Sequence, residues 1–132
     1  MITSDDLLAQ PYDDYMNDQQ LAFFNDRLLS KAQDLRDRLN AHQHDVEIER
    51  HPDEADFASD EEERAVTVKM IERDRVTLGQ VSHALELIRQ GDYGFCKETG
   101  EPIGLQRLLL VPESVYCVES MRVIEAKGRH QI

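Results

Sequence analysis

Two long stretches with a helical spacing of apolar residues, separated by one proline, most strongly constrain the fold of this chain. The first begins at Asn17 or Asp18, either of which could cap a helix. Along it, one helical face carries Leu21, Phe24, Leu28, Leu35, Leu39, His42 and Val46. The second stretch runs from about residue 53 to residue 90. Its face carries Ile71, Leu78 and Leu85 at seven-residue intervals, with Val81, Ile88, Ala58, Ala65 and Val68 beside them.

Pro52 separates the two stretches, because a proline disfavours helix for the residue before it and suits a turn or the first position of a new helix. Each predicted helix of about 30 residues would extend about 45 Å at 1.5 Å per residue. Two such helices joined by a short turn predict a long antiparallel coiled-coil hairpin over residues 17–90, with its tip near residues 51–58. Gly91 is suited to end the second helix. Residues 1–16 form a leader that is either poorly ordered or separately docked.

The two cysteines stand in a spacing typical of a zinc ribbon. Cys96-x-x-Thr99 and Cys117-x-x-Ser120 reproduce two CxxC knuckles about twenty residues apart, but a hydroxyl replaces the second thiol of each pair. Hydroxyls are poor zinc ligands, so we expect a metal-free fold, although two thiolates and a nearby histidine could still hold zinc weakly.

Residues 91–132 therefore predict a small zinc-ribbon-like globular domain that ends in a helix near residues 117–127. Apolar residues would replace the metal as its core, and they would dock on the hairpin base near Tyr93 and Phe95. These residues are Leu105, Leu108, Leu109, Leu110, Val111, Val115, Val118 and Ile124. The predicted fold class is mainly α-helical.

Charge and composition exclude several classes of function. Residues 1–64 hold 18 acidic and 6 basic side chains, and the whole chain has a net charge of −12. No basic cluster is present, which disfavours direct DNA binding. No apolar run reaches the roughly 18 residues of a membrane span, and the start MITSDDLLAQ does not resemble a signal peptide. We therefore expect a cytoplasmic protein, and two cysteines in that reducing compartment are not a disulfide framework.

The motifs resemble those of the DksA/TraR C4 zinc-finger family. The finger pattern continues through Ile103, Arg107 and Pro112, with the second ligand of each pair replaced, and Gly91–Phe95 resembles the segment that precedes the finger in this family. Upstream, Asp53–Ala58 matches the DxxDxA found at the tip of the family's coiled coil. These motifs follow in the family's order over residues 15–130, and the chain looks most like a zinc-independent member.

The resemblance implies a bacterial transcription factor without enzymatic activity that enters the secondary channel of RNA polymerase. It implies that Asp53, Asp56 and Ala58 lie near the polymerase active site and alter open-complex stability, repressing ribosomal RNA promoters and favouring some biosynthetic ones. The simpler interpretation is that these aspartates only stabilise a helix start. The family also implies a ppGpp-related role for Arg73, but the two associated lysine positions are Gln80 and Met121 here.

Two other classes of function remain open from the sequence. A Gre-type transcript-cleavage factor shares the hairpin and the acidic tip, whereas a structural coiled-coil scaffold would use the hairpin only for self-association. An intramolecular hairpin predicts a monomer, and a scaffold predicts a concentration-dependent dimer. The histidines are scattered; His42 and His83 could fall on the hairpin seam, where a solvated or hydrogen-bonded histidine is more common than a metal ligand.

Overall fold

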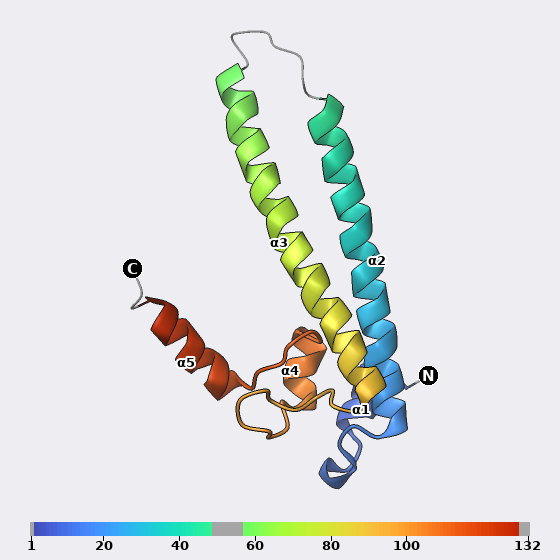
Figure 1. Cartoon of the computed structure of the whole chain (residues 1–132). Coiled ribbons are helices and arrows are strands. Elements are labelled where there is room, and N and C mark those ends of the chain that lie inside the picture. Colours follow the sequence, from blue (N-terminus) through green and yellow to red (C-terminus); the bar gives the residue numbers. More distant parts are fainter. Residues whose placement is uncertain (1, 49–56, 130–132) are drawn as a thin grey trace.

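The computed structural model describes residues 2–48 and 57–129, and they form a helical hairpin that rises from a small base (Figure 1). The helices are α1 (Ser4–Leu8), α2 (Asp18–Ile48), α3 (Phe57–Gln90), α4 (Leu105–Leu110) and α5 (Val118–Arg129), with a short 3-10 turn, η1 (Tyr12–Asp14). Within the described ranges, β structure is limited to one isolated antiparallel bridge between Phe95 and Pro102. The predicted mainly α-helical fold class is confirmed. No described helix is both long and apolar enough to cross a bilayer.

Local sequence signals fix both ends of the hairpin at its base. The Asn17 side chain accepts a hydrogen bond of 2.9 Å from the backbone N–H of Gln20, which caps the start of α2. At the end of α3, the N–H groups of Gly91 and Asp92 bond to carbonyls of the last helical turn, and Gly91 has a φ of +83°. This pairing is a Schellman motif, in which glycine is favoured because it adopts a left-handed backbone without strain.

The two long helices pack against each other along a seam that is best formed near the base. Leu28, Leu35, Val81 and Ala84 are buried there, and α2 and α3 make the most extensive contact between elements in the described chain. The predicted coiled-coil hairpin is thus confirmed. At 31 and 34 residues, the helices extend about 45 to 50 Å, so the far end of the hairpin stands well away from the base (Figure 1).

Further from the base, the predicted face of the second helix is wrong. Ala65 and Val68 are exposed, whereas Arg64 and Thr67 are partly buried, and the two helices draw apart towards the tip (Figure 1). In a straight α-helix, residues spaced seven apart shift around the helix axis by about 20° per heptad. A heptad face that lies in the seam near the base therefore rotates out of the seam further along, unless the helices supercoil. His83 is also exposed rather than in the seam, while His42 is partly buried.

The core lies at the base, where the hairpin, the leader and the finger segment meet. Its buried apolar residues are Leu7, Phe23, Phe24, Leu28, Ala32, Leu35, Val81, Ala84, Tyr93, Cys96, Ile103 and Leu108. Leu7 from α1 is fully buried in this cluster, so the leader is docked rather than loose. The Phe24 and Tyr93 rings lie 5.7 Å apart between centroids and join α2 to the finger segment.

The apolar residues expected to replace zinc are only partly buried. Leu108 is fully buried, and Leu105 and Leu109 pack against the core. Leu110, Val118 and Ile124, however, are exposed, which corrects the prediction that they belong to the core. For Leu110 the reason is geometric: successive residues of a helix project about 100° apart, so Leu108, Leu109 and Leu110 of α4 cannot all face the core.

Candidate functional site

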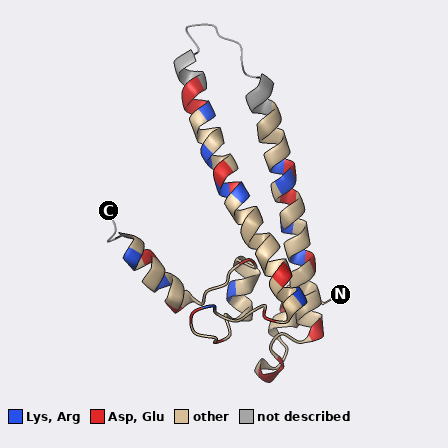
Figure 2. Cartoon of the chain, in the orientation of Figure 1, with Lys and Arg blue, Asp and Glu red and all other residues tan. Residues whose placement is uncertain are grey.

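The tip residues that the sequence singles out lie mostly beyond the described structure. Asp53 and Asp56 fall outside the described residues, and Ala58 is placed only by its backbone, in the first turn of α3. The next residues with described burial, Glu61, Glu62 and Glu63, are exposed, and acidic residues are coloured red near this end of α3 in Figure 2. The hairpin therefore carries negative charge close to its tip, at the end furthest from the base.

The four positions of the degenerate finger contain a compact hydrogen-bonded cluster instead of four metal ligands. The Ser120 hydroxyl oxygen lies 3.3 Å from the Cys96 sulfur and 3.3 Å from the Cys117 sulfur. The Cys117 thiol donates to this oxygen, which leaves the serine hydroxyl proton free to bond to Cys96. Thr99 accepts a hydrogen bond from the backbone N–H of Glu101. The serine that replaces a zinc ligand thus links the two remaining thiols.

These hydrogen bonds change the acidity of Cys96. Burial raises the pKa of its thiol, but hydrogen bonds from the Ser120 and Thr99 side chains and from the backbone N–H groups of Cys117 and Thr99 outweigh burial. The pKa of Cys96 falls from 9.0 to about 6. The backbone donors of the knuckles, which would stabilise metal-bound thiolates, here stabilise a thiolate without a metal.

The donor set does not fit a structural zinc ion. A closed zinc site has four nitrogen or sulfur ligands, whereas this frame offers two sulfurs and two hydroxyls, and Ser120 is already engaged by both sulfurs. Among the described residues, no group of three or more His, Cys, Asp or Glu side chains is placed to hold a metal. The finger positions are therefore an assembly of hydrogen bonds within the protein's own side chains.

Two side chains of α2 and one of the finger segment itself hold residues 109–113 in place. Lys31 of α2 forms an ion pair of 2.7 Å with the buried Glu113. The Tyr93 hydroxyl donates to the Pro112 carbonyl at 2.8 Å, and burial raises the pKa of Tyr93, so this donor stays protonated. Arg27 donates to the Leu109 carbonyl at 3.1 Å. Three contacts thus anchor residues 109–113.

Tyr15 provides a further anchor from the leader. Its hydroxyl donates to the Gly94 carbonyl at 2.6 Å and accepts from the Gly104 N–H at 3.0 Å, so it joins the two sides of the finger segment. Gly94 is required at this contact, because its φ is +95° and an added Cβ would lie 2.9 Å from the Met16 side chain. Tyr15 was not predicted from the sequence, since no local motif marks a tyrosine that bonds to segments about eighty to ninety residues away.

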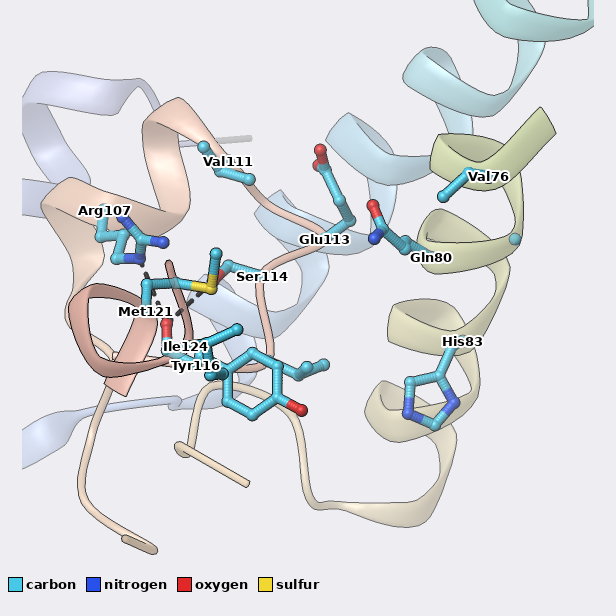
Figure 3. Close-up of a pocket in the computed structure, with 12 residues that line it drawn as sticks. Val76, Gln80, His83, Arg107, Val111, Glu113, Ser114, Tyr116, Met121 and Ile124 are labelled. Carbon is cyan, nitrogen blue, oxygen red and sulfur yellow. Dashed lines mark hydrogen bonds between the residues drawn. The ribbon is translucent and has the colours of Figure 1, made fainter. Parts of the chain in front are cut away.

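A cleft of about 550 Å³ separates α3 from the finger segment and α5 (Figure 3). Gln80 and His83 line it from α3, and Met121 and Ile124 line it from α5. Gly79 also lines the cleft, and a Cβ at this position would meet no neighbouring atom within 4 Å. The structure therefore brings together Gln80 and Met121, the two positions at which the family resemblance expects lysines.

The charge of this cleft is close to balanced. Among the described residues that line the cleft, only Arg107 carries a positive charge and only Glu113 a negative one. The Arg107 Nε atom already donates to the Tyr116 carbonyl at 3.2 Å. Arg73 is exposed on α3 but does not line the cleft. An anion with several phosphate charges would find few free cationic donors in this cleft.

One buried ionic contact lies within the hairpin seam and was not expected from the sequence. Asp74 of α3 is almost completely buried, and one of its carboxylate oxygens accepts a hydrogen bond of 3.0 Å from Arg38 of α2. The other oxygen, Oδ2, is buried without a hydrogen-bond partner in the described part of the chain. Asp74 occupies a seam position that a heptad pattern assigns to an apolar residue, so only the packing reveals it.

A long hairpin beside a segment with four ligand-spaced positions, two of them cysteines and two hydroxyl residues, defines the class of helical hairpin proteins with a C4-type finger, here in a degenerate form. Comparison with family descriptions agrees with this class. "DnaK suppressor protein DksA, N-terminal domain" matches residues 20–88, and "Prokaryotic dksA/traR C4-type zinc finger" matches residues 91–119. The chain belongs to the DksA/TraR family.

Individual relatives give the same result. The chain is 39% identical over 117 residues to the RNA polymerase-binding transcription factor DksA of Caulobacter vibrioides, covering 87% of this chain and 82% of that protein. It is 30% identical over 123 residues to the protein of the same name from Escherichia coli K12, covering 91% and 81%. The structure of transcription factor DksA2 from Pseudomonas aeruginosa matches with a TM-score of 0.84 and 43% identity, covering 97% of this chain and all of that one. These relatives are named as transcription factors rather than enzymes.

Proposed function

We propose that this chain is a cytoplasmic, monomeric transcription factor that binds RNA polymerase and inserts its hairpin through the secondary channel. The observation that carries the proposal is the geometry of α2 and α3, which extend about 45 to 50 Å from the base and which the DxxDxA segment joins in the sequence. A thin helical pair with an acidic tip fits a narrow channel, while the wider base remains outside. Similarity to relatives that are RNA polymerase-binding transcription factors supports this partner.

The mechanism that we propose requires no bond to be made or broken by this chain. Asp53 and Asp56 would bring two carboxylates close to the polymerase catalytic centre, with Ala58 also near it, and would change the local charge around its mobile elements. The acidic residues Glu61–Glu63 at the start of α3 would add to this negative potential. The outcome is a shorter lifetime of promoter open complexes, with repression of ribosomal RNA promoters and activation of some biosynthetic promoters.

The role of the tip can be tested by measuring two quantities separately: binding to polymerase, and the lifetime of promoter open complexes. Asp53→Asn and Asp56→Asn keep side-chain size and the capacity to cap a helix, so they should leave the hairpin folded. Both variants should bind core RNA polymerase as the parent does, but should no longer shorten open-complex lifetime at a ribosomal promoter. If both variants shorten it as the parent does, the aspartates act only at the helix start and the proposed role of the tip is wrong.

We also propose that the chain works without zinc. The hydrogen bonds of Ser120 to both thiols, together with the anchors provided by Lys31, Tyr93 and Tyr15, support this proposal. The purified protein should contain less than one zinc per chain and keep its thermal unfolding midpoint in excess EDTA. One tightly bound zinc per chain, with unfolding in EDTA, would contradict zinc independence.

We propose ppGpp as a co-effector whose effect on open-complex lifetime is smaller here than in a relative that carries the arginine and both lysines. The arginine is present as Arg73, but Gln80 and Met121 stand at the two lysine positions and line the cleft. The charges of Arg107 and Glu113, which also line it, nearly cancel. Open-complex lifetimes measured with and without ppGpp test this statement. Gln80→Lys together with Met121→Lys should increase the ppGpp response, because each substitution adds a charge-assisted donor facing the cleft. An unchanged response in the double variant would show that the cleft does not bind the nucleotide.

A further inference from the structure

Apolar side chains from the leader, α4 and the first residue of α5 enclose a groove on the base. Its volume is about 640 Å³, which lies within the range of small-molecule binding sites. Tyr12 and Leu110 on its walls are both 82% exposed, and Leu8 and Val118 are also exposed. Ile103, which lines the groove as well, is buried. Single exposed apolar residues are common on protein surfaces, but a group of them around one hollow indicates a binding site.

The uncharged polar side chains of the groove are engaged within the protein. The Gln10 side chain accepts from Asn17 and from the buried Gln20, both at 2.9 Å, and donates to Gln19 at 2.8 Å. Gln20 in turn accepts from the backbone N–H of Met16 at 2.7 Å. This network fixes the leader before any ligand binds, so little conformational entropy is lost on binding. It also leaves the apolar side chains as the main surface that a ligand would meet.

One residue supplies the charge of the groove. Arg107 lines it, and no aspartate or glutamate stands among the described residues that line it. The Arg107 Nε atom donates to the Tyr116 carbonyl (Figure 3), whereas its two terminal nitrogens have no hydrogen-bond or ion-pair partner in the described part of the chain. A guanidinium with two uncommitted donor nitrogens is suited to hold a carboxylate in a bidentate pair.

The positive charge of Arg107 is unopposed in the groove but not in the cleft beside α3. Arg107 lines both cavities, whereas Glu113 lines only the cleft. Asp13 and Asp14 follow Tyr12 in η1 without lining the groove. The lining therefore favours an anion. A single arginine suits one carboxylate better than a phosphate with several charges, which would need more cationic donors.

We propose that this groove binds a small amphiphile with one carboxylate and a hydrocarbon chain, of the class of free medium-chain fatty acids. The carboxylate pairs with the terminal nitrogens of Arg107, and the chain covers Leu110 and Tyr12, which removes their apolar surface from water. Such binding is a property of the isolated chain, so the inference goes beyond the proposed function and does not rest on it. A membrane surface fits less well, because a net charge of −12 is repelled by anionic lipids.

The test is calorimetric titration of the purified full-length chain with decanoate, at concentrations below those at which decanoate forms micelles. One decanoate should bind per chain, with a dissociation constant below about 1 mM, as expected for a ligand of this size. Octanoate, which is shorter by two methylenes, should bind about tenfold more weakly, because each buried methylene contributes about threefold to fourfold in affinity.

Two pairs of variants locate the chain and the carboxylate separately. Leu110→Ser removes a side chain that is 82% exposed, so this variant should unfold at the parent's temperature but bind decanoate at least about fivefold more weakly. Leu29→Ser is its matched control, because Leu29 is 51% exposed on α2 and does not line the groove.

Arg107→Gln removes the charge, and it should also weaken decanoate binding at least about fivefold, whereas Arg107→Lys, which keeps a cation, should bind with an intermediate affinity. Arg122→Gln is the matched control on α5, because Arg122 is exposed and does not line the groove. Both controls should bind decanoate within about twofold of the parent. The Leu110 variant leaves the bond between Arg107 and Tyr116 intact, so it tests the groove even if Arg107→Gln unfolds.

Four results would overturn the proposal. The first is an absence of saturable decanoate binding to the parent. The second is equal binding by Leu110→Ser and Leu29→Ser, which would place the ligand outside the groove. The third is unchanged binding by a folded Arg107→Gln variant, which would remove the carboxylate contact. The fourth is flotation of the parent, but not of Leu110→Ser, with phosphatidylglycerol vesicles, which would identify a bilayer as the occupant.

Discussion

The buried contact between Arg38 and Asp74 predicts that two substitutions of one ion pair have unequal effects on stability. The pair is unequal: the Arg38 side chain is 55% exposed, whereas that of Asp74 is 3% exposed and has one oxygen without a partner. Arg38→Met removes the only described donor to the carboxylate and leaves both of its oxygens buried and unpaired. Asp74→Leu removes the buried carboxylate and leaves an arginine that water can still hydrate.

The magnitudes follow from burial. Removing one partner of a fully buried pair costs about 3 to 5 kcal/mol, and the partial exposure of Arg38 reduces the expected cost of Arg38→Met to about 2 to 3 kcal/mol. In Asp74→Leu, the lost ion pair is offset by relief of the unpaired oxygen and by about 1 to 2 kcal/mol of apolar burial in the seam. The free energy of unfolding should therefore stay within about 1 kcal/mol of the parent or rise.

Urea unfolding followed by circular dichroism measures both free energies by linear extrapolation. Arg36→Met is the matched control, because Arg36 is an exposed arginine on the same helix, and it should change the free energy of unfolding by less than about 0.5 kcal/mol. If Asp74→Leu costs as much as Arg38→Met, the ion pair stabilises the hairpin and the asymmetry argument is refuted. If Arg38→Met behaves like the control, Asp74 obtains its donor from elsewhere.

Three further predictions concern the base. Thr99→Cys with Ser120→Cys should restore four thiols, so the double variant should bind one zinc per chain by elemental analysis and unfold at a higher temperature than the parent. The pKa of the Cys96 thiol is about 6 in the folded protein and 9.0 for a free thiol, so between pH 6 and pH 9 the unfolded state binds more protons than the folded state. The free energy of unfolding should therefore rise from pH 6 to pH 9. Cys96→Ser should flatten this rise. Tyr15→Phe removes the hydroxyl that bonds to the backbones of Gly94 and Gly104. In the same urea assay this should lower the free energy of unfolding by about 1 to 3 kcal/mol. No loss would mean that water replaces the hydroxyl.

The sequence alone was sufficient for the features that depend on local chemistry. Helical periodicity predicted both long helices, and capping residues fixed their basal ends at Asn17 and Gly91. The finger spacing and the DxxDxA segment indicated the family, because these motifs are contiguous or follow at short, fixed intervals. Asp53, Asp56 and the role of the tip remain predictions, since they lie outside the described residues.

Only the tertiary structure decided which residues meet across long separations. It showed that Ser120 links Cys96 and Cys117, that Asp74 lies in the seam, and that Leu110 faces solvent while Leu108 is buried. Periodicity gives the face of a helix but not the neighbour that covers it, and a heptad register drifts wherever two helices diverge, as it does at Ala65 and Val68. The sequence determines the helices and their ends because those depend on interactions within a few residues. The anchors that hold the finger without four thiolates depend on segments up to about ninety residues apart, and only the packed fold brings them together.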